Sequence, residues 1–188
     1  MKRKKKNQFR KSTLKLKKNH TWTAPDGYKV VVLDRGVVSF NVPLDWVVAK
    51  TEPFELNDAE PPDDEARLTT SFWRTAPGID WSALPLDDLL VKSADGGDLD
   101  ILEKGAVNKV PRDDLELVWT YQRFLDAEEK REAFTRIAVA RGWDVYALIT
   151  SDFWVDDLAR LEPIWAEVLR SLQLGRTIED PTRGAVLQ

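Results

Sequence analysis

The sequence has no cysteine and a single histidine, His20, among its 188 residues. Without cysteine the chain forms no disulfide bond, offers no thiolate nucleophile and builds no zinc–thiolate site. Histidine is the side chain that most often titrates near neutral pH, and His20 lies at the end of a basic N-terminal segment. A pair of histidine and nucleophile inside the folded part of the chain is therefore excluded.

Long apolar runs and catalytic sequence motifs are missing as well. No apolar stretch approaches the roughly 20 residues that span a bilayer, and Met1–His20 lacks the apolar centre of a secretory signal. The chain contains no G-x-x-x-x-G-K-S/T, G-x-G-x-x-G, H-E-x-x-H or G-x-S-x-G motif. We therefore predict a cytoplasmic protein that uses no cofactor and is not an enzyme.

Carboxylates are the remaining candidates for acid–base or metal chemistry. Adjacent acids occur at Asp63–Asp64, Asp87–Asp88, Asp113–Asp114, Glu128–Glu129 and Asp156–Asp157. All of these pairs lie in expected loops or at expected helix starts, where solvation and the helix dipole account for them. An enzyme that uses carboxylates or a metal ion would need acids from distant segments to converge in one cleft, and this third function class stays open.

One acidic turn, Asp95–Asp100, places hard oxygen ligands around Gly96 and Gly97, a composition that suits calcium. Its spacing departs from that of an EF-hand loop. We interpret the segment as an Asp–Gly turn and predict no metal site.

Positive charge is concentrated at the N-terminus. Residues 1–18 hold ten Lys or Arg and no acid, so the rest of the chain has 28 − 10 = 18 basic residues against 32 acidic ones. Like charges repel, and no amphipathic period is present, so we predict a disordered basic arm over residues 1–20. Its candidate polyanion contacts are Lys2, Arg3, Lys4, Lys5, Lys6, Arg10, Lys11, Lys15, Lys17 and Lys18.

The basic arm has two competing interpretations. In the first it has no binding role, and is a solubilising tail or sequence read from a misplaced start codon. In the second it is an electrostatic tether to nucleic acid, an acidic lipid surface or an acidic protein. Phe9 is its only aromatic residue, so base stacking has little support. Non-specific polyanion contact is the strongest function that the arm supports.

The C-terminal half predicts the architecture. Two strand-like runs, Phe134–Ala140 and Trp143–Thr150, meet at Arg141–Gly142, and Leu158–Leu172 is apolar at helical spacing. A β-hairpin that leads into a helix predicts an α+β fold, in which the C-terminal helix packs on one face of an antiparallel sheet. Pro163 either kinks this helix or lies in the first turn of a restarted one.

Further elements follow from the same patterns. Ser151 or Asp152 is expected to cap the last helix, and Gly175 to follow it. In Gly36–Val42 apolar residues alternate with polar ones, which predicts one buried and one wetter face. Leu115–Leu125 is expected to be a strand, with its apolar residues on one face and Glu116, Thr120 and Gln122 on the other. The other expected elements are strands at Tyr28–Leu33, Arg67–Arg74 and, irregularly, Leu99–Val110, a helix at Pro85–Lys92 and a loop at Glu52–Glu65. We predict one globular domain over residues 21–175 and a loose tail over 176–188.

Two tryptophans, Trp73 and Trp81, flank a turn at Pro77–Gly78. Core packing is the default role for both. If they face solvent beside Arg74, the three residues would form a protein-docking patch, because Trp and Arg are enriched among the residues that dominate binding energy.

Two segments resemble PsbP-like domains. The run from Gly36 to Trp46, GVVSFNVPLDW, resembles the opening of such domains, and Ile164–Leu172, IWAEVLRSL, resembles their last helix. The resemblance extends from about Trp22 to Leu174 and implies an α/β/α sandwich around a central antiparallel sheet. The group includes photosystem II extrinsic subunits and a Ran-binding nuclear transport factor, so it implies docking or assembly more than catalysis.

Together these observations predict a non-enzymatic protein-binding or assembly module with an unidentified protein partner. The alternative is a polyanion-binding protein that contacts nucleic acid or an acidic membrane surface through its basic arm.

Overall fold

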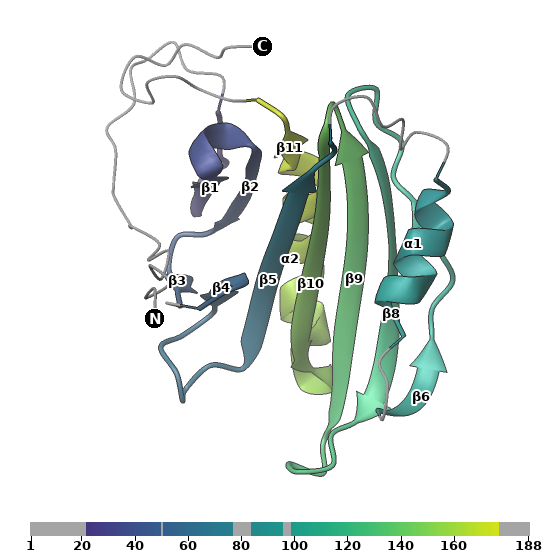
Figure 1. Ribbon diagram of the computed structural model, residues 1–188. Helices are drawn as coiled ribbons and strands as arrows, with labels where there is room; N and C mark the ends of the chain where they lie inside the picture. Colours follow the sequence, from purple (N-terminus) through teal and green to yellow (C-terminus); the bar gives the residue numbers. More distant parts are fainter. Residues whose placement is uncertain (1–21, 50, 77–83, 96–98, 177–188) are drawn as a thin grey trace, which may run out of the picture.

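The computed structural model describes residues 22–49, 51–76, 84–95 and 99–176. These residues form two antiparallel sheets and two α-helices (Figure 1). The large sheet has the strand order β3-β4-β5-β10-β9-β8-β6, with β7 also paired to β8, and the small sheet has the order β1-β2-β11. The α+β class and the antiparallel sheet predicted from the sequence are thus confirmed.

The strands are β1 Tyr28–Leu33, β2 Val38–Pro43, β3 Val47–Val48, β4 Phe54–Asn57, β5 Ala66–Arg74, β6 Asp100–Lys104, β7 Asn108–Lys109, β8 Glu116–Leu125, β9 Glu132–Gly142, β10 Val145–Trp154 and β11 Gln173–Leu174. The helices are α1 Leu86–Ser93 and α2 Leu158–Ser171, with short 3-10 turns at Asp34–Gly36 and Val155–Asp157. The irregular strand expected over Leu99–Val110 is confirmed as β6 and β7, on either side of Gly105.

The predicted central hairpin is β9 and β10, but its turn lies two residues later than expected. Gly142 stays in β9 and pairs with Val145, so Trp143 and Asp144 form the turn. β10 also runs past Ser151 and Asp152, because both residues pair with β9 and β5. These residues therefore do not cap the last helix, as the sequence suggested.

Helix α2 confirms the predicted amphipathic helix. Leu161, Trp165, Val168 and Leu169 are buried along one side. Pro163 lies inside the helix, which continues on both sides of it, so the helix does not restart there. Asp157 occupies the N-cap position. The buried side of α2 packs on the apolar side of the large sheet, which is where the main core lies.

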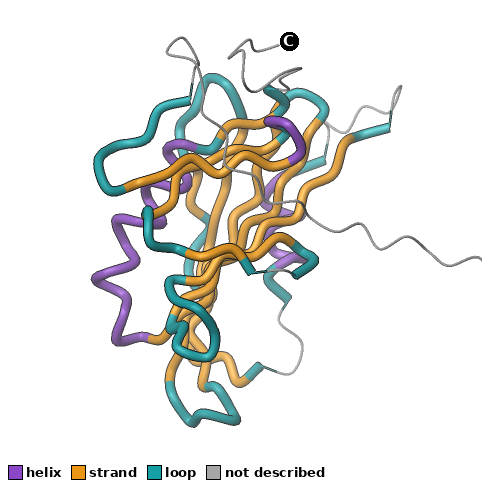
Figure 2. The backbone as a smooth tube through the Cα atoms, turned by 90° about the vertical axis from the view of Figure 1, so that its left-hand side faces the viewer, coloured by secondary structure: helices purple, strands orange, loops and turns teal. Residues whose placement is uncertain are grey.

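The two helices cover opposite faces of the large sheet. Figure 2 shows α2 on one side of the strands of the large sheet and α1 on the other. α1 lies over β8 and β9, and its buried Leu86 and Leu90 form a second core with Tyr146. The α/β/α arrangement that the PsbP resemblance implies is therefore present.

The expectation of one wetter face on Gly36–Val42 is wrong. Ser39 and Asn41 of β2 are buried, because α2 packs against β2. Thr120 and Gln122 of β8 are buried as well, near α1, and each finds a backbone carbonyl. Thr120 donates to the carbonyl of Gly105 at 2.8 Å, and Gln122 donates to that of Ala94.

Part of the expected loop Glu52–Glu65 is the strand β4. Phe54 and Leu56 are buried, and they pair with Thr70 and Leu68 of β5. The alternation of Phe54 and Leu56 is hard to recognise in the sequence because acidic residues and prolines surround this short strand.

Candidate docking surface

A row of four side chains crosses the large sheet at one end. Trp73 of β5 pairs with Tyr146 of β10, which pairs with Arg141 of β9, which pairs with Glu116 of β8. Paired residues of a sheet project to the same face, so all four lie on the face that carries α1. The row joins residues that are far apart in the sequence.

Neighbours in this row are in direct contact. The rings of Trp73 and Tyr146 are stacked, with centroids 5.6 Å apart and an interplanar angle of 11°. Arg141 donates a hydrogen bond from Nη1 to the Tyr146 hydroxyl at 3.2 Å, and its Nη2 lies 2.7 Å from both carboxylate oxygens of Glu116. Arg141 therefore fixes the ring on which Trp73 rests.

Arg141 is well suited to this supporting role, because only 12% of its side chain is exposed. Burial alone would lower its pKa, but the hydrogen bonds to Glu116 and Tyr146 outweigh burial and raise the pKa. Nη1 also donates to the carbonyl of Leu84 at 3.0 Å. The guanidinium thus stays charged and held from several sides.

Trp73 itself is 44% exposed, although Tyr146 beneath it is buried. Arg74, next to it, forms an ion pair with Asp144 at 2.8 Å, and both of these side chains are about half exposed. The backbone N–H of Thr75 donates to the carbonyl of Asp144 at 2.8 Å, which ties the end of β5 to the β9–β10 turn. Of the three predicted docking residues, Trp73 and Arg74 lie together here, whereas Trp81 lies outside the described residues.

A fourth residue at this end, Trp143, is not among the predicted docking residues. It shares the alternation of Val145 and Ala147, so the sequence pattern places it in the strand. In the structure it lies in the turn with a φ of 56°, and 69% of its surface is exposed. A bulky residue in the left-handed region is strained by about 1–3 kcal/mol. The turn-forming Asp144 beside it was the one available signal.

Trp143 packs over a glycine. A Cβ atom placed on Gly175 would lie 2.9 Å from both Cβ and Cγ of Trp143, so only glycine fits below the indole. Gly175 follows β11 and has a φ of 70°, which also favours glycine. Trp143 therefore lies toward the small sheet, and Trp73 lies on the α1 face. We call Trp73, Arg74, Trp143 and Asp144 the tryptophan end.

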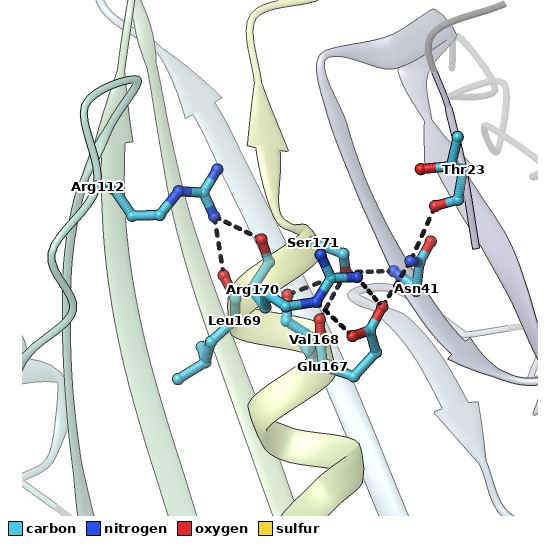
Figure 3. Close-up of polar contacts among 8 residues, drawn as sticks. All are labelled: Thr23, Asn41, Arg112, Glu167, Val168, Leu169, Arg170 and Ser171. Carbon is cyan, nitrogen blue, oxygen red and sulfur yellow. Dashed lines mark hydrogen bonds and ion pairs between the residues drawn. The ribbon is translucent and has the colours of Figure 1, made fainter. Parts of the chain in front are cut away.

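A polar cluster joins the small sheet to α2 (Figure 3). The backbone N–H of Asn41 donates to Ser171 Oγ at 2.8 Å, and Asn41 Nδ2 donates to Glu167 Oε1 at 2.7 Å. Arg170 holds the same carboxylate at 2.7 Å and is the main reason that the pKa of Glu167 is lowered. This cluster fixes β2 against α2, and the chain then passes through β11 to Gly175 under Trp143.

Arg112 caps the carbonyl end of α2. Its guanidinium donates to the backbone oxygens of Leu169 at 3.1 Å, Arg170 at 2.8 Å and Leu172 at 2.9 Å; Figure 3 shows the first two of these contacts. A helix leaves its last carbonyls without partners, and a cation there also meets the negative end of the helix dipole. The sequence offered no signal for this long-range cap.

A cavity of about 370 Å³ lies beside the row, between the start of α1 and β8. Its charged lining residues have partners: Lys109 pairs with Asp87 at 3.0 Å, Arg141 with Glu116, and Arg112 with Asp114. Each charged side chain among the described lining residues is thus part of an ion pair, and none stands out as a candidate general acid or base.

Three of the acidic pairs noted in the sequence contact different cations: Asp87 meets Lys109, Asp114 meets Arg112, and Asp157 meets Arg160. Within residues 22–49, 51–76, 84–95 and 99–176, no group of three or more His, Asp or Glu could hold a metal ion. Three residues of the predicted acidic turn, 96–98, lie outside these ranges, as do all ten candidate polyanion contacts of the basic arm.

None of the helices in the described ranges is long and apolar enough to cross a membrane.

Comparison with solved structures supports the fold. The solution structure of cyanobacterial PsbP (CyanoP) from Synechocystis sp. PCC 6803 matches with a TM-score of 0.56 at 11% identity, over 81% of this chain and 95% of that one. LpqN of Mycobacterium tuberculosis, a protein involved in cell envelope biogenesis, matches with a TM-score of 0.53 at 12% identity, over 78% of this chain and 89% of that one. The predicted PsbP-like fold is thus confirmed.

A much closer relative is similar along almost the whole sequence. The chain is 45% identical over 186 residues to the uncharacterised protein alr1449 of Nostoc sp. (strain PCC 7120 / SAG 25.82 / UTEX 2576). The alignment covers 97% of this chain and 96% of that protein. Residues 29–178 match the Alr1449 family, and the chain therefore belongs to that family, on a PsbP-like fold.

Proposed function

We propose that this protein is a non-enzymatic docking or assembly module that binds a protein partner through the tryptophan end. The observation that carries the proposal is the exposure of two indoles, Trp73 and Trp143, at one end of the large sheet. Trp and Arg are over-represented among the residues that contribute most to binding energy. Arg74 lies beside Trp73, so this end combines both residue types.

Both indoles are held in place before any partner arrives. Trp73 is stacked on Tyr146, which Arg141 anchors. Trp143 rests on the backbone at Gly175. A side chain that is already ordered loses little conformational entropy on binding, so more of its contact energy appears as affinity. This rigidity supports a role in recognition.

Local charge also suits an interface. Arg74 is paired with Asp144, and Arg141 with Glu116, so the charges at this end balance each other. The chain beyond residue 18 is otherwise strongly acidic. The centres of protein interfaces are depleted in unpaired charge. A partner can therefore approach this end without facing the excess negative charge of the rest of the chain.

Site-specific crosslinking in the full-length protein tests the proposal. A photoreactive amino acid is placed at position 73 or 143, and at position 102 as a control, because Leu102 is exposed to a similar extent as Trp73 but lies on β6 at the far edge. We expect one protein to crosslink from 73 and 143 but not from 102, and its measured affinity to fall at least about tenfold in Trp143→Ala. Equal crosslinking from all three positions, or an unchanged affinity, would contradict the proposal.

A second candidate function is polyanion binding by the basic arm, supported by the ten cations in residues 1–18. If the arm contacts phosphates, the logarithm of affinity for duplex DNA falls with the logarithm of salt concentration by about 0.9 per contact. A salt titration with DNA, RNA and acidic vesicles measures this slope. Deletion of residues 1–18 should abolish the binding; binding that survives deletion excludes the arm as its source.

A further inference from the structure

The edges of the two sheets differ in how far they discourage pairing with another chain. Edge strands expose unpaired backbone groups, and proteins blunt them by shortness, bulges or charge. β3 and β11 have only two residues each. β6 is irregular between Ile101 and Glu103, and it carries charges at Asp100, Glu103 and Lys104. β1 has six residues, pairs with β2 along its whole length, and has no neighbouring strand on its other side among the described residues.

The hydrogen-bond alternation of β1 shows which groups face this open edge. Leu44 donates its N–H to the carbonyl of Gly27 at 2.9 Å, so Gly27 bonds toward the β2 side. In an antiparallel pair every second residue does so, which assigns Lys29, Val31 and Leu33 to the β2 side as well. The N–H and C=O groups of Val30 and Val32 then point to the open edge.

Nothing on β1 itself protects these groups. Its only charged residue is Lys29, whose ammonium group donates to the carbonyls of Leu44 and Trp46 and is thus directed toward its own fold. Val30 and Val32 are β-branched, which favours strand pairing, and Val32 is 36% exposed. The edge is therefore regular, apolar and long enough to accept another strand.

We propose that β1 pairs with β1 of a second copy of this chain, antiparallel and about a two-fold axis at Val31. Val30 then lies opposite Val32 of the second copy, and each such pair exchanges both of its backbone hydrogen bonds. Because residues of equal parity face each other, the core side of one small sheet continues the core side of the other. The two three-stranded sheets become one sheet with the order β11-β2-β1-β1-β2-β11.

Charge favours a second copy as the occupant. β1 and β2 together carry a single charged residue, Lys29, and the two-fold arrangement places it opposite Leu33 of the second copy. No like charges therefore face each other across the new pair, and like charges opposite one another would destabilise it. An acidic body that repels its own copies elsewhere meets no such repulsion along this edge.

Analytical ultracentrifugation of the full-length protein tests the inference with two matched variants. Val32→Lys places a charge on the open edge, whereas Val91→Lys places the same charge on α1, where Val91 is 61% exposed. We expect a dimer whose dissociation constant rises at least about tenfold in Val32→Lys and is unchanged in Val91→Lys. Equal effects of both variants, or a wild-type protein that stays monomeric at every concentration, would overturn it.

Amide hydrogen exchange of the wild-type protein provides a test that needs no variant. The amides of Val30 and Val32 should exchange slowly in concentrated samples and quickly after dilution, while those of Lys29 and Val31 stay slow in both. Protection of Val30 and Val32 in a monomer would mean that another segment of the same chain covers the edge, and would overturn the proposal. This inference is independent of the tryptophan end, because Trp143→Ala should leave the dimer intact.

Discussion

The indole of Trp73 lies nearly parallel to the phenol ring of Tyr146, with 5.6 Å between the centroids. The two residues are register partners on β5 and β10, 73 positions apart in the sequence. The stack holds the exposed side chain of Trp73, at the end of β5, in one orientation. Its support continues through Arg141 to Glu116, so the geometry of the exposed ring depends on four strands.

Replacement of Trp73 by alanine should separate binding from folding. We expect a loss of about 1–2 kcal/mol in the free energy of unfolding, because the stack and part of the buried ring surface disappear. Affinity for the crosslinked partner should fall at least about tenfold. Urea unfolding and titration calorimetry measure the two quantities. Leu102→Ala, at a similarly exposed residue, should leave affinity unchanged. An equal loss of affinity in both variants would argue against a docking surface confined to the tryptophan end.

Arg141→Met should destabilise the protein more than the loss of an ordinary surface ion pair. The variant removes hydrogen bonds to Glu116, Tyr146 and the Leu84 carbonyl from a mostly buried position. We expect a cost of about 2–3 kcal/mol in urea unfolding. Arg67→Met is the matched control, because Arg67 pairs with Asp152 while half exposed, and such pairs contribute about 0–1 kcal/mol. Equal losses of unfolding free energy in the two variants would show that Arg141 stabilises the protein no more than a half-exposed ion pair does.

Gly175→Ala tests the close contact under Trp143. The added methyl group would meet Cβ and Cγ of Trp143 at 2.9 Å, at a residue whose φ is 70°. We expect a loss of about 1–3 kcal/mol in thermal or urea unfolding. Combined with Trp143→Gly, the same substitution should cost less, because the clash is gone and only the backbone strain is left. Additive effects in this double-mutant cycle would contradict the contact.

Acid should weaken the link between the small sheet and α2. Hydrogen bonds from Arg170 and Asn41 lower the pKa of Glu167 in the folded state, against the opposing effect of burial. The stabilisation is therefore fully present above the unfolded pKa, about 4.3, and is lost as the pH falls through the lower folded pKa. Melting temperatures measured from pH 6 to pH 3 should show this fall. Glu167→Gln should show a shallower one; parallel curves would exclude Glu167 as a source.

Much of the fold follows from local patterns. The strands β5, β8, β9 and β10 and the helix α2 are predictable because alternation with a period of two, or apolar spacing near 3.6, appears within each segment. The position of the β9–β10 turn is not predictable in this way. Trp143 continues the alternation of Val145, and pairing of Gly142 across the hairpin overrides the turn that its composition suggests.

Part of the candidate surface was also visible in the sequence. Trp73 and Arg74 stand out as an aromatic residue and a cation next to an expected turn, and the structure places both at the end of β5. Trp143 was missed because an exposed tryptophan and a buried one look alike in an alternating run. Whether Trp81 joins the surface stays a prediction, as does the function of the basic arm.

The sequence alone determined the α+β class, the apolar faces of the main strands and of α2, and the separation of basic and acidic charge, because each depends on residues close together in the chain. The burial of Ser39, Asn41, Thr120 and Gln122, and the row formed by Trp73, Tyr146, Arg141 and Glu116, became visible in the folded structure. Both outcomes depend on strand register and on which elements cover each face of the sheet. Those are set by contacts between distant segments, which no local period encodes.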